Sequence, residues 1–451
     1  MKKVFAGSMS TFIEYLDNSI CSALAADESA RLLRDAGVHE VREDDAWPEE
    51  AGSAYFIRRP NGGLVAVRQG SVSPVEAGFR VLAAHTDSPA LKLKPEGLHR
   101  KQGGTYVPVE IYGGPIRSTW LDRELLLTGR AVLRTEDGSL KSRNFSTQEP
   151  CAVIPNVAIH LNRDVNKGFE YNAQDHLQLR ITISGSDSYR KANPDDGSVP
   201  NDASERAEFW ALIASKLNCR VEDIVAADIF AADAAGACIL SDRETIVSGR
   251  LDNLAGCYSN IQAFLNAEPG NPTHILALFD NEEIGSRTAA GADSGFLESV
   301  LSRLLPESMA ERAHATRRSM LVSNDGAHAL HDAYAGKYDP DYAPALGAGP
   351  VLKTNAQYRY ASTSDGIAVV LETARRNGIQ LQYLAGRSDM RTGSTIGPFS
   401  WSRTGFCTVD MGIPMMAMHS IRETANMTDI RDISGLLTSL LELSAESLPD
   451  S

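Results

Sequence analysis

An apolar run meets a pair of carboxylates in the segment HILALFDNEEIGS, residues 274–286. The run at 274–279 predicts a buried strand, and strand ends are where α/β proteins commonly place their chemistry. Neighbouring side chains at a strand end point in different directions, so one glutamate can bind a metal ion while the other handles a proton. The segment therefore predicts a metal-dependent hydrolase, with further ligands supplied by other parts of the chain.

Other polar residues follow apolar strands in the same way. Together with Glu283, the candidate ligands are His85, Asp252, Asp325 and His419. Each alone is weak evidence, because a histidine at a strand end is more often structural, and Asp252 can equally cap the helix that begins there. As a set, imidazole and carboxylate groups without a thiolate suit catalytic zinc, manganese or cobalt.

Two such ions, about 3.5–4 Å apart, need a bridging carboxylate, for which Asp252 is the candidate. Each ion then takes two of the other four ligands. Water activated between two ions loses a proton near neutral pH. Glu282 is next to a candidate ligand and is not needed as a ligand itself, so it can accept that proton and pass it to the leaving amine. Asp87, two residues after His85 on an extended chain, can orient the His85 ring.

The chain has 451 residues, which is too long for one ordinary core, so two domains are expected. Apolar strands and helical patterns flank a middle segment of short alternating strands, which predicts a β-rich insertion within an α/β domain. The expected boundaries assign residues 1–94 and 237–451 to the α/β domain and residues 95–236 to the insertion.

Charge and hydropathy exclude several classes of partner. The net charge of -14 disfavours nucleic acid and anionic membranes, and it means that an acidic substrate would need local positive charge in its pocket. No apolar run approaches the roughly 18 residues of a membrane span. The N-terminus lacks the apolar core of a signal peptide, so a cytoplasmic location is expected. The six scattered cysteines predict neither disulfides nor a thiolate metal site.

Several segments resemble the aspartyl aminopeptidase family, which consists of cocatalytic dizinc exopeptidases. They are AHTDSP (84–89), LKLKP (91–95), RLDNL (250–254), DNEEIGS (280–286), SND (323–325), GRSDMR (386–391), GSTIGP (393–398) and MHSIRE (418–423). The resemblance extends over nearly the whole chain. It implies a phosphorylase/hydrolase-like zinc exopeptidase domain, interrupted by a β-rich dimerisation domain, and a homododecamer built from dimers.

The resemblance also implies a role for each candidate residue. The metal ligands would be His85, Asp252, Glu283, Asp325 and His419. Glu282 would be the general base, and Asp87 would polarise His85. Spacing alone does not decide which of the two adjacent glutamates is the base and which is the ligand. His160, in the segment IPNVAIHLN (154–162), would enter the active site of the neighbouring subunit and stabilise the tetrahedral oxyanion. Metal binding is the alternative role for His160.

Two basic residues, His328 and Lys353, match positions of the family's substrate pocket, although Lys353 can also be an ordinary surface lysine. The chain departs from the family pattern close to them. Gly326 replaces a methionine, Asp332-Ala333 follows His331 where Pro-Asn is usual, and Thr392 replaces a cysteine. These departures put the substrate preference in more doubt than the reaction.

The expected function is removal of N-terminal Asp or Glu from peptides by a metalloaminopeptidase with two divalent ions, zinc being preferred over manganese or cobalt. The alternatives are a dizinc exopeptidase of broad specificity and a non-enzymatic, self-assembling scaffold. The partners expected are peptides with a free N-terminus and further copies of the chain, without nucleic acid or membrane.

Overall fold

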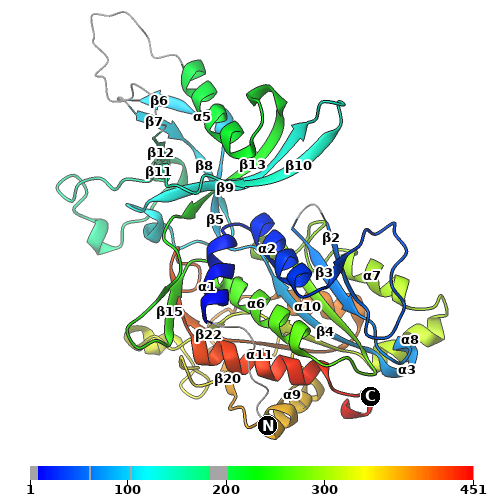
Figure 1. Cartoon of the computed structure of the whole chain (residues 1–451). Helices are drawn as coiled ribbons and strands as arrows, with labels where there is room; N and C mark the ends of the chain where they lie inside the picture. The colour runs from blue at the N-terminus through cyan, green and yellow to red at the C-terminus, as the bar shows by residue number, and fades with distance from the viewer. Residues whose placement is uncertain (1–8, 60–61, 102–103, 183–201, 450–451) are drawn as a thin grey trace, which may run out of the picture. The chain divides into compact units, whose positions relative to one another are not determined.

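A computed structural model of the chain describes residues 9–59, 62–101, 104–182 and 202–449. The chain forms two compact units (Figure 1). The first consists of Met1–Ser88, Ala237–Met418 and Arg422–Ser451, and the second of Pro89–Gly236 and His419–Ile421.

A mixed nine-stranded sheet forms the centre of the first unit. In spatial order its strands are β1 (His39–Glu40), β2 (Ala54–Arg58), β3 (Leu64–Arg68), β16 (Thr273–Phe279), β4 (Phe79–His85), β17 (Met320–Asn324), β21 (Cys407–Gly412), β19 (Val351–Thr354) and β20 (Gln382–Ala385). The strand predicted at 274–279 is confirmed as β16, and the apolar strands expected before His85 and Asp325 are confirmed as β4 and β17. These three and β21 are parallel neighbours, an arrangement that requires cover on both faces.

Helices provide this cover. On β4, Leu82 and Ala84 belong to one apolar cluster, whereas Val81 and Ala83 belong to another, because successive side chains point to opposite faces. The first cluster contains residues of α1 (Met9–Asn18), α2 (Ser22–Asp35), α6 (Leu251–Asn266), α9 (Ser364–Asn377) and α11 (Met427–Leu441). The second contains residues of α7 (Phe296–Leu304), α8 (Met309–Arg317) and α10 (Ile396–Thr404). The predicted α/β fold class is confirmed.

A smaller sheet of five strands also belongs to the first unit. Its order is β14 (Cys238–Ile239), β15 (Thr245–Ser248), β23 (Glu423–Asn426), β22 (Pro414–Met416) and β18 (Ala327–His328). β15 leads to Asp252 and β18 carries His328. The candidate residues therefore come from two different sheets.

The second unit is rich in strands and has its own apolar core, which includes Trp120, Phe145 and Phe209. Its sheet runs β6 (His99–Lys101), β7 (Gly104–Val107), β12 (Leu179–Ile181), β11 (Ala152–Val153), β9 (Leu125–Arg134), β13 (Ile224–Asp233), β5 (Ala90–Leu93) and β8 (Val109–Tyr112), with β10 (Leu140–Ser146) paired to β9. The helix α5 (Asp202–Leu217) contributes Phe209 to this core.

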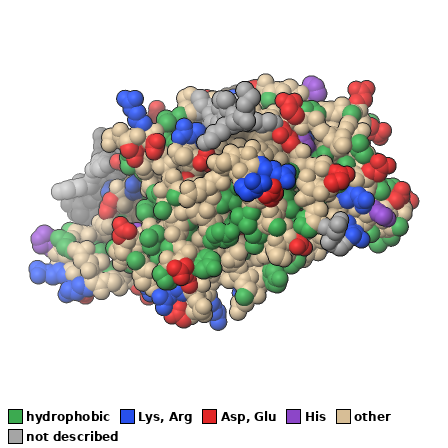
Figure 2. Space-filling view, turned by 90° about the horizontal axis from the view of Figure 1, so that it is seen from below, with side chains coloured by type: hydrophobic (Ala, Val, Ile, Leu, Met, Phe, Trp, Pro, Cys, Tyr) green, Lys and Arg blue, Asp and Glu red, His purple; other side chains and the backbone are tan. Residues whose placement is uncertain are grey.

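The surface shows no single dominant charge on the face drawn in Figure 2. Hydrophobic side chains gather near its middle, and acidic and basic side chains are scattered around them. Within the described residues, no helix has both the length and the apolar character that crossing a lipid bilayer requires.

Candidate metal centre

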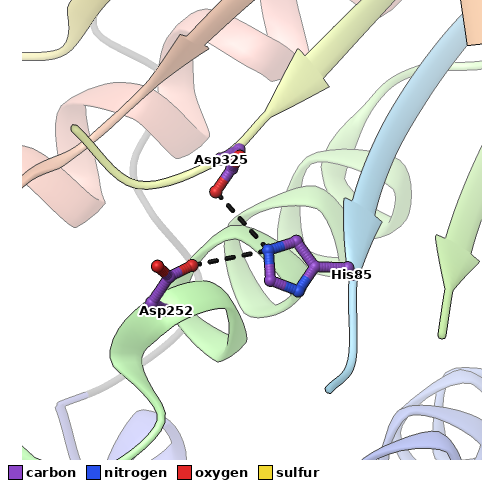
Figure 3. Close-up of side chains that lie close together, drawn as sticks. All are labelled: His85, Asp252 and Asp325. Atoms are coloured by element: carbon purple, nitrogen blue, oxygen red, sulfur yellow. Dashed lines mark ion pairs between the residues drawn. The ribbon is translucent and has the colours of Figure 1, made fainter. Parts of the chain in front are cut away.

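Three of the predicted ligands, His85, Asp252 and Asp325, lie together in the first unit (Figure 3). His85 Nε2 is 3.4 Å from Asp252 Oδ1 and 3.5 Å from Asp325 Oδ1. One ligand atom from each residue lies within 4.8 Å of the others, and all three residues are buried. A single ion can therefore contact all three.

Strand order accounts for much of this convergence. β16, β4 and β17 are parallel neighbours, so their carboxyl ends meet at one edge of the sheet. β4 ends on His85, β17 ends immediately before Asp325, and β16 is followed by the short helix η5 (Glu282–Ile284). The glutamate pair thus follows the strand adjacent to the one that carries His85.

Asp252 reaches the same place from the start of α6. Asp252 and Asn253 have non-helical backbone angles, and the N-cap position is Arg250, which makes no side-chain capping bond. The N-cap position of α6 therefore falls on Arg250 and not on Asp252. Its N–H donates to Glu423 Oε2 at 2.9 Å, and its carbonyl oxygen accepts a bond of 2.5 Å from Ser88 Oγ.

Asp87 connects the histidine with the glutamate pair. Its backbone oxygen lies 3.1 Å from His85 Nδ1, and its Oδ1 lies 3.5 Å from the same nitrogen. Its two carboxylate oxygens also accept the backbone N–H groups of Glu282, at 3.0 Å, and Glu283, at 3.1 Å. One residue therefore contacts His85 Nδ1, through its backbone oxygen at hydrogen-bonding distance, and its carboxylate holds the turn that carries both glutamates.

The centre holds more negative charge than its protein groups neutralise. Burial and nearby carboxylates raise the pKa of Glu282 to about 8, and burial together with Asp252 raises the pKa of Glu283 well above its usual range. Burial favours a neutral His85, yet hydrogen bonds to the surrounding aspartates raise its pKa. Carboxylates crowded in this way are stabilised as anions by a cation among them. The imidazole and carboxylate donors fit zinc or a similar divalent ion.

Lys353 is buried rather than a surface lysine, because only 2% of it is exposed. Its Nζ lies 3.6 Å from Asp325 Oδ2 and 5.4 Å from the centre of the Tyr360 ring. Burial disfavours the charged amine, but Asp325, together with Tyr360, Asp410 and Asp252, outweighs that effect and raises the pKa of Lys353. Its positive charge is therefore directed at a ligand candidate.

Three further predicted residues, His328, His160 and His419, come from other segments of the chain. His328 is exposed on β18 and lines a cavity of about 400 Å³ in the first unit. In the second unit, His160 is exposed in a segment that also exposes Val157, Ile159 and Leu161. His419 is grouped with the second unit, where its Nδ1 lies 3.1 Å from the backbone oxygen of Gly114.

Sequence reasoning did not single out three residues beside the centre. Glu423 is 1% exposed and accepts the N–H of Asp252. Cys257 Sγ lies 3.0 Å from the backbone oxygen of His85, and Tyr360 faces Lys353. Glu423 is the last residue of the segment MHSIRE, so its closeness to His419 in the sequence could have pointed to it. Nothing in the sequence pointed to Cys257 or Tyr360, because only folding brings them to these partners.

Comparison with known proteins assigns the chain to a family. Residues 15–440 match the model of aminopeptidase I zinc metalloprotease (M18). A probable M18 family aminopeptidase 2 of Pseudomonas aeruginosa (strain UCBPP-PA14) is 39% identical over 430 residues, which cover 94% of this chain and 96% of that relative.

Solved structures share the fold. The structure of the Ape4 and Nbr1 complex contains a chain with a TM-score of 0.88 and 32% identity, covering 95% of this chain and 84% of that one. The mApe1 dodecamer of S. cerevisiae has a TM-score of 0.79 and 24% identity, covering 95% of each chain.

Proposed function

We propose that this chain, which belongs to the aminopeptidase I zinc metalloprotease family (M18), removes acidic residues from the N-terminus of peptides. By its family membership the chain is a zinc-dependent aminopeptidase, a hydrolase. The convergence of His85 and Asp325, at the ends of parallel strands, with Asp252, at the start of α6, is the observation that carries the proposed chemistry. The details of metal, mechanism and substrate that follow are proposals.

We assign two divalent ions to the site, zinc in the first place and manganese or cobalt as alternatives. His85 and Asp325 would hold one ion, Glu283 and His419 would hold the other, and Asp252 would contribute to both. When bound, the ions supply Lewis acidity, which polarises the substrate carbonyl and lowers the pKa of water.

Glu282 is the proposed general base. It adjoins the ligand Glu283, and its backbone is held by the Asp87 carboxylate, so its side chain starts from an anchored position. It takes a proton from the attacking water and returns that proton to the leaving amine, which balances the hydrolysis. Following the motif resemblance, His160 of a neighbouring copy stabilises the oxyanion.

The preference for acidic side chains rests on positive charge in the first unit. Lys353 presents its Nζ to Asp325, and His328 follows Asp325 by three residues on an exposed strand. In a chain of net charge -14, local cations of this kind are what an acidic side chain requires.

Hydrolysis of aspartyl, glutamyl and leucyl peptides, with zinc added and with a chelator, tests the proposal. We expect the two acidic substrates to be cleaved faster and all cleavage to stop on chelation. Cleavage that survives complete metal removal would contradict the metal mechanism. Faster cleavage of the leucyl peptide would contradict only the acidic preference.

A dizinc exopeptidase of broad specificity is the second candidate, because the ion pair with Asp325 engages Lys353. The substitution Lys353→Met separates the two candidates. If the preference is acidic, this variant loses most of its advantage for aspartyl over leucyl peptides. If specificity is broad, the ratio of the two rates stays near the wild-type value.

We also propose self-association, as a homododecamer built from dimers through the second unit, and a cytoplasmic location. The exposed apolar side chains around His160 support an interface there, and six free cysteines suit a reducing compartment. Light scattering of the purified chain and fractionation of cells test these two points. A monomer in solution would leave His160 without the site it is proposed to enter.

A further inference from the structure

A cavity of about 400 Å³ in the first unit has an unusual charge. Among its described lining residues are Lys337, Arg387 and Arg391, the histidines 328 and 331, and no Asp or Glu. We call it the cationic cavity. The charged residues of this lining are thus all basic. This is unexpected in a chain with a net charge of -14.

Most of this positive charge is available to a ligand. Arg387 pairs with Asp389 at 2.9 Å, and that aspartate is itself 66% exposed. Over the ranges that the structure describes, no ion pair involves Lys337 or Arg391. One carboxylate would neutralise only one of these cations, so the cavity can accept a ligand with more than one negative charge.

The cavity adjoins the metal centre by two routes. Tyr360 lines it, and the same ring faces Lys353 Nζ, which is 3.6 Å from Asp325 Oδ2. His328 also lines it, three residues after Asp325 in the chain. The carboxylates of the metal centre would attract the N-terminal ammonium group of a peptide. The basic residues of the cavity would attract its acidic side chains.

Positions that depart from the family pattern lie at or next to the cavity. Thr392 lines it, and so does His331, which directly precedes the departing Asp332 and Ala333. At Gly326, an added Cβ would lie 2.6 Å from Met415 Cε and 3.1 Å from Met418 Cε, and both methionines line the cavity. The space beside Gly326 is thus filled by methionine side chains from another strand and a loop.

We propose that the cationic cavity selects peptides whose first two residues are both acidic. This inference rests on the proposed function and extends it from the first residue to the second. The volume supports it, because pockets of roughly 300–1,000 Å³ hold drug-sized ligands, whereas a carboxymethyl group has only a few non-hydrogen atoms. Three permanent cations likewise exceed the single charge of one Asp side chain.

Release of the first residue from Asp-Asp-Ala-Ala, Asp-Ala-Ala-Ala and Asp-Lys-Ala-Ala by the zinc-loaded enzyme tests the proposal, with kcat/KM measured by mass spectrometry at low and high salt. We expect Asp-Asp to exceed Asp-Ala by roughly fivefold at low salt, the upper end for one exposed charge pair, and Asp-Lys to be slowest. Added salt should shrink these ratios.

The double variant Lys337→Gln/Arg391→Gln should bring the ratio of Asp-Asp to Asp-Ala close to one. Both residues are exposed, so folding should survive, and thermal unfolding checks this. Arg317→Gln is the matched control, because Arg317 is exposed on α8 and does not line the cavity; it should keep the wild-type ratio.

Equal rates for Asp-Asp and Asp-Ala in the wild type, or an undiminished ratio in the double variant, would overturn the inference. Neither outcome affects the proposed function. If the enzyme instead cleaves Leu-Ala-Ala-Ala and not Asp-Ala-Ala-Ala, the proposed function fails. The cavity is then tested by the ratio of Leu-Asp-Ala-Ala to Leu-Ala-Ala-Ala, where equal rates would again overturn the inference.

Discussion

The metal centre and the cationic cavity are neighbours with opposite character. The centre is buried, rich in carboxylates and built at strand ends, and its residues fall in segments that resemble a known family. The cavity is lined partly by exposed loop residues and by positive charge, and its wall contains Thr392, one of the departures from that family. The difference indicates that the scaffold preserves the chemistry while loops adjust the substrate.

Removal of the shared ligand should have the largest effect. Asp252→Ala takes away a carboxylate assigned to both ions, so we expect metal content and turnover to fall together to background. Elemental analysis and peptide hydrolysis measure both quantities. Asp341→Ala, at an exposed aspartate, is the control and should change neither. Full activity in Asp252→Ala would place the centre elsewhere.

Glu282→Gln should separate catalysis from metal binding. Loss of the proton acceptor is expected to lower kcat by about 10²–10⁴-fold while metal content stays near wild type. Glu283→Gln provides the comparison, because it should lose metal as well. If metal is lost from the first variant and kept by the second, the two glutamates have exchanged roles.

Asp87→Asn should have an intermediate effect, about 10–100-fold on metal affinity or activity. In the amide an NH2 donor replaces one of the two carboxylate oxygens, so the N–H group of Glu282 or of Glu283 would lose its acceptor in this geometry. Metal titration and kcat together measure the outcome. A variant with unchanged values of both would show that the backbone contacts of Asp87 do not position the centre.

Gly326→Met should have the smallest effect on the rate of hydrolysis. It should alter the packing of the methionines that line the cationic cavity. The new side chain meets Met415 and Met418, and such overpacking costs about 1–3 kcal/mol of stability. Adding Met418→Ala should restore part of this stability, as thermal unfolding can measure. A single variant as stable as the wild type would mean that the methionines move aside freely.

Strands and ligand candidates could be predicted from the sequence because their signals are local. The runs before His85 and Glu283 are apolar, and a polar residue marks the end of each run. In the structure β4 ends on His85, and β16 ends on Phe279, directly before Asp280. A helix cap at Asp252 was equally compatible with the local sequence, whereas the N-cap position of α6 falls two residues earlier, on Arg250.

The surroundings of Lys353 could not be predicted, because its partners come from distant segments. Asp325 and Tyr360 reach it from a different strand and from a loop. The cationic cavity likewise combines residues near 330, 390 and 415. Tertiary packing brings such residues together, and neither the periodicity of the sequence nor its charge composition predicts that packing.

An anomalous-scattering map of crystals grown with zinc tests the central claim most directly. It should show one peak within about 2.0–2.2 Å of His85 Nε2 and of a carboxylate oxygen of Asp252 and of Asp325. A second peak should lie beside Glu283 and His419. Absence of any peak at His85, Asp252 and Asp325, or a peak held by His160 instead, would contradict the assignment of the metal centre.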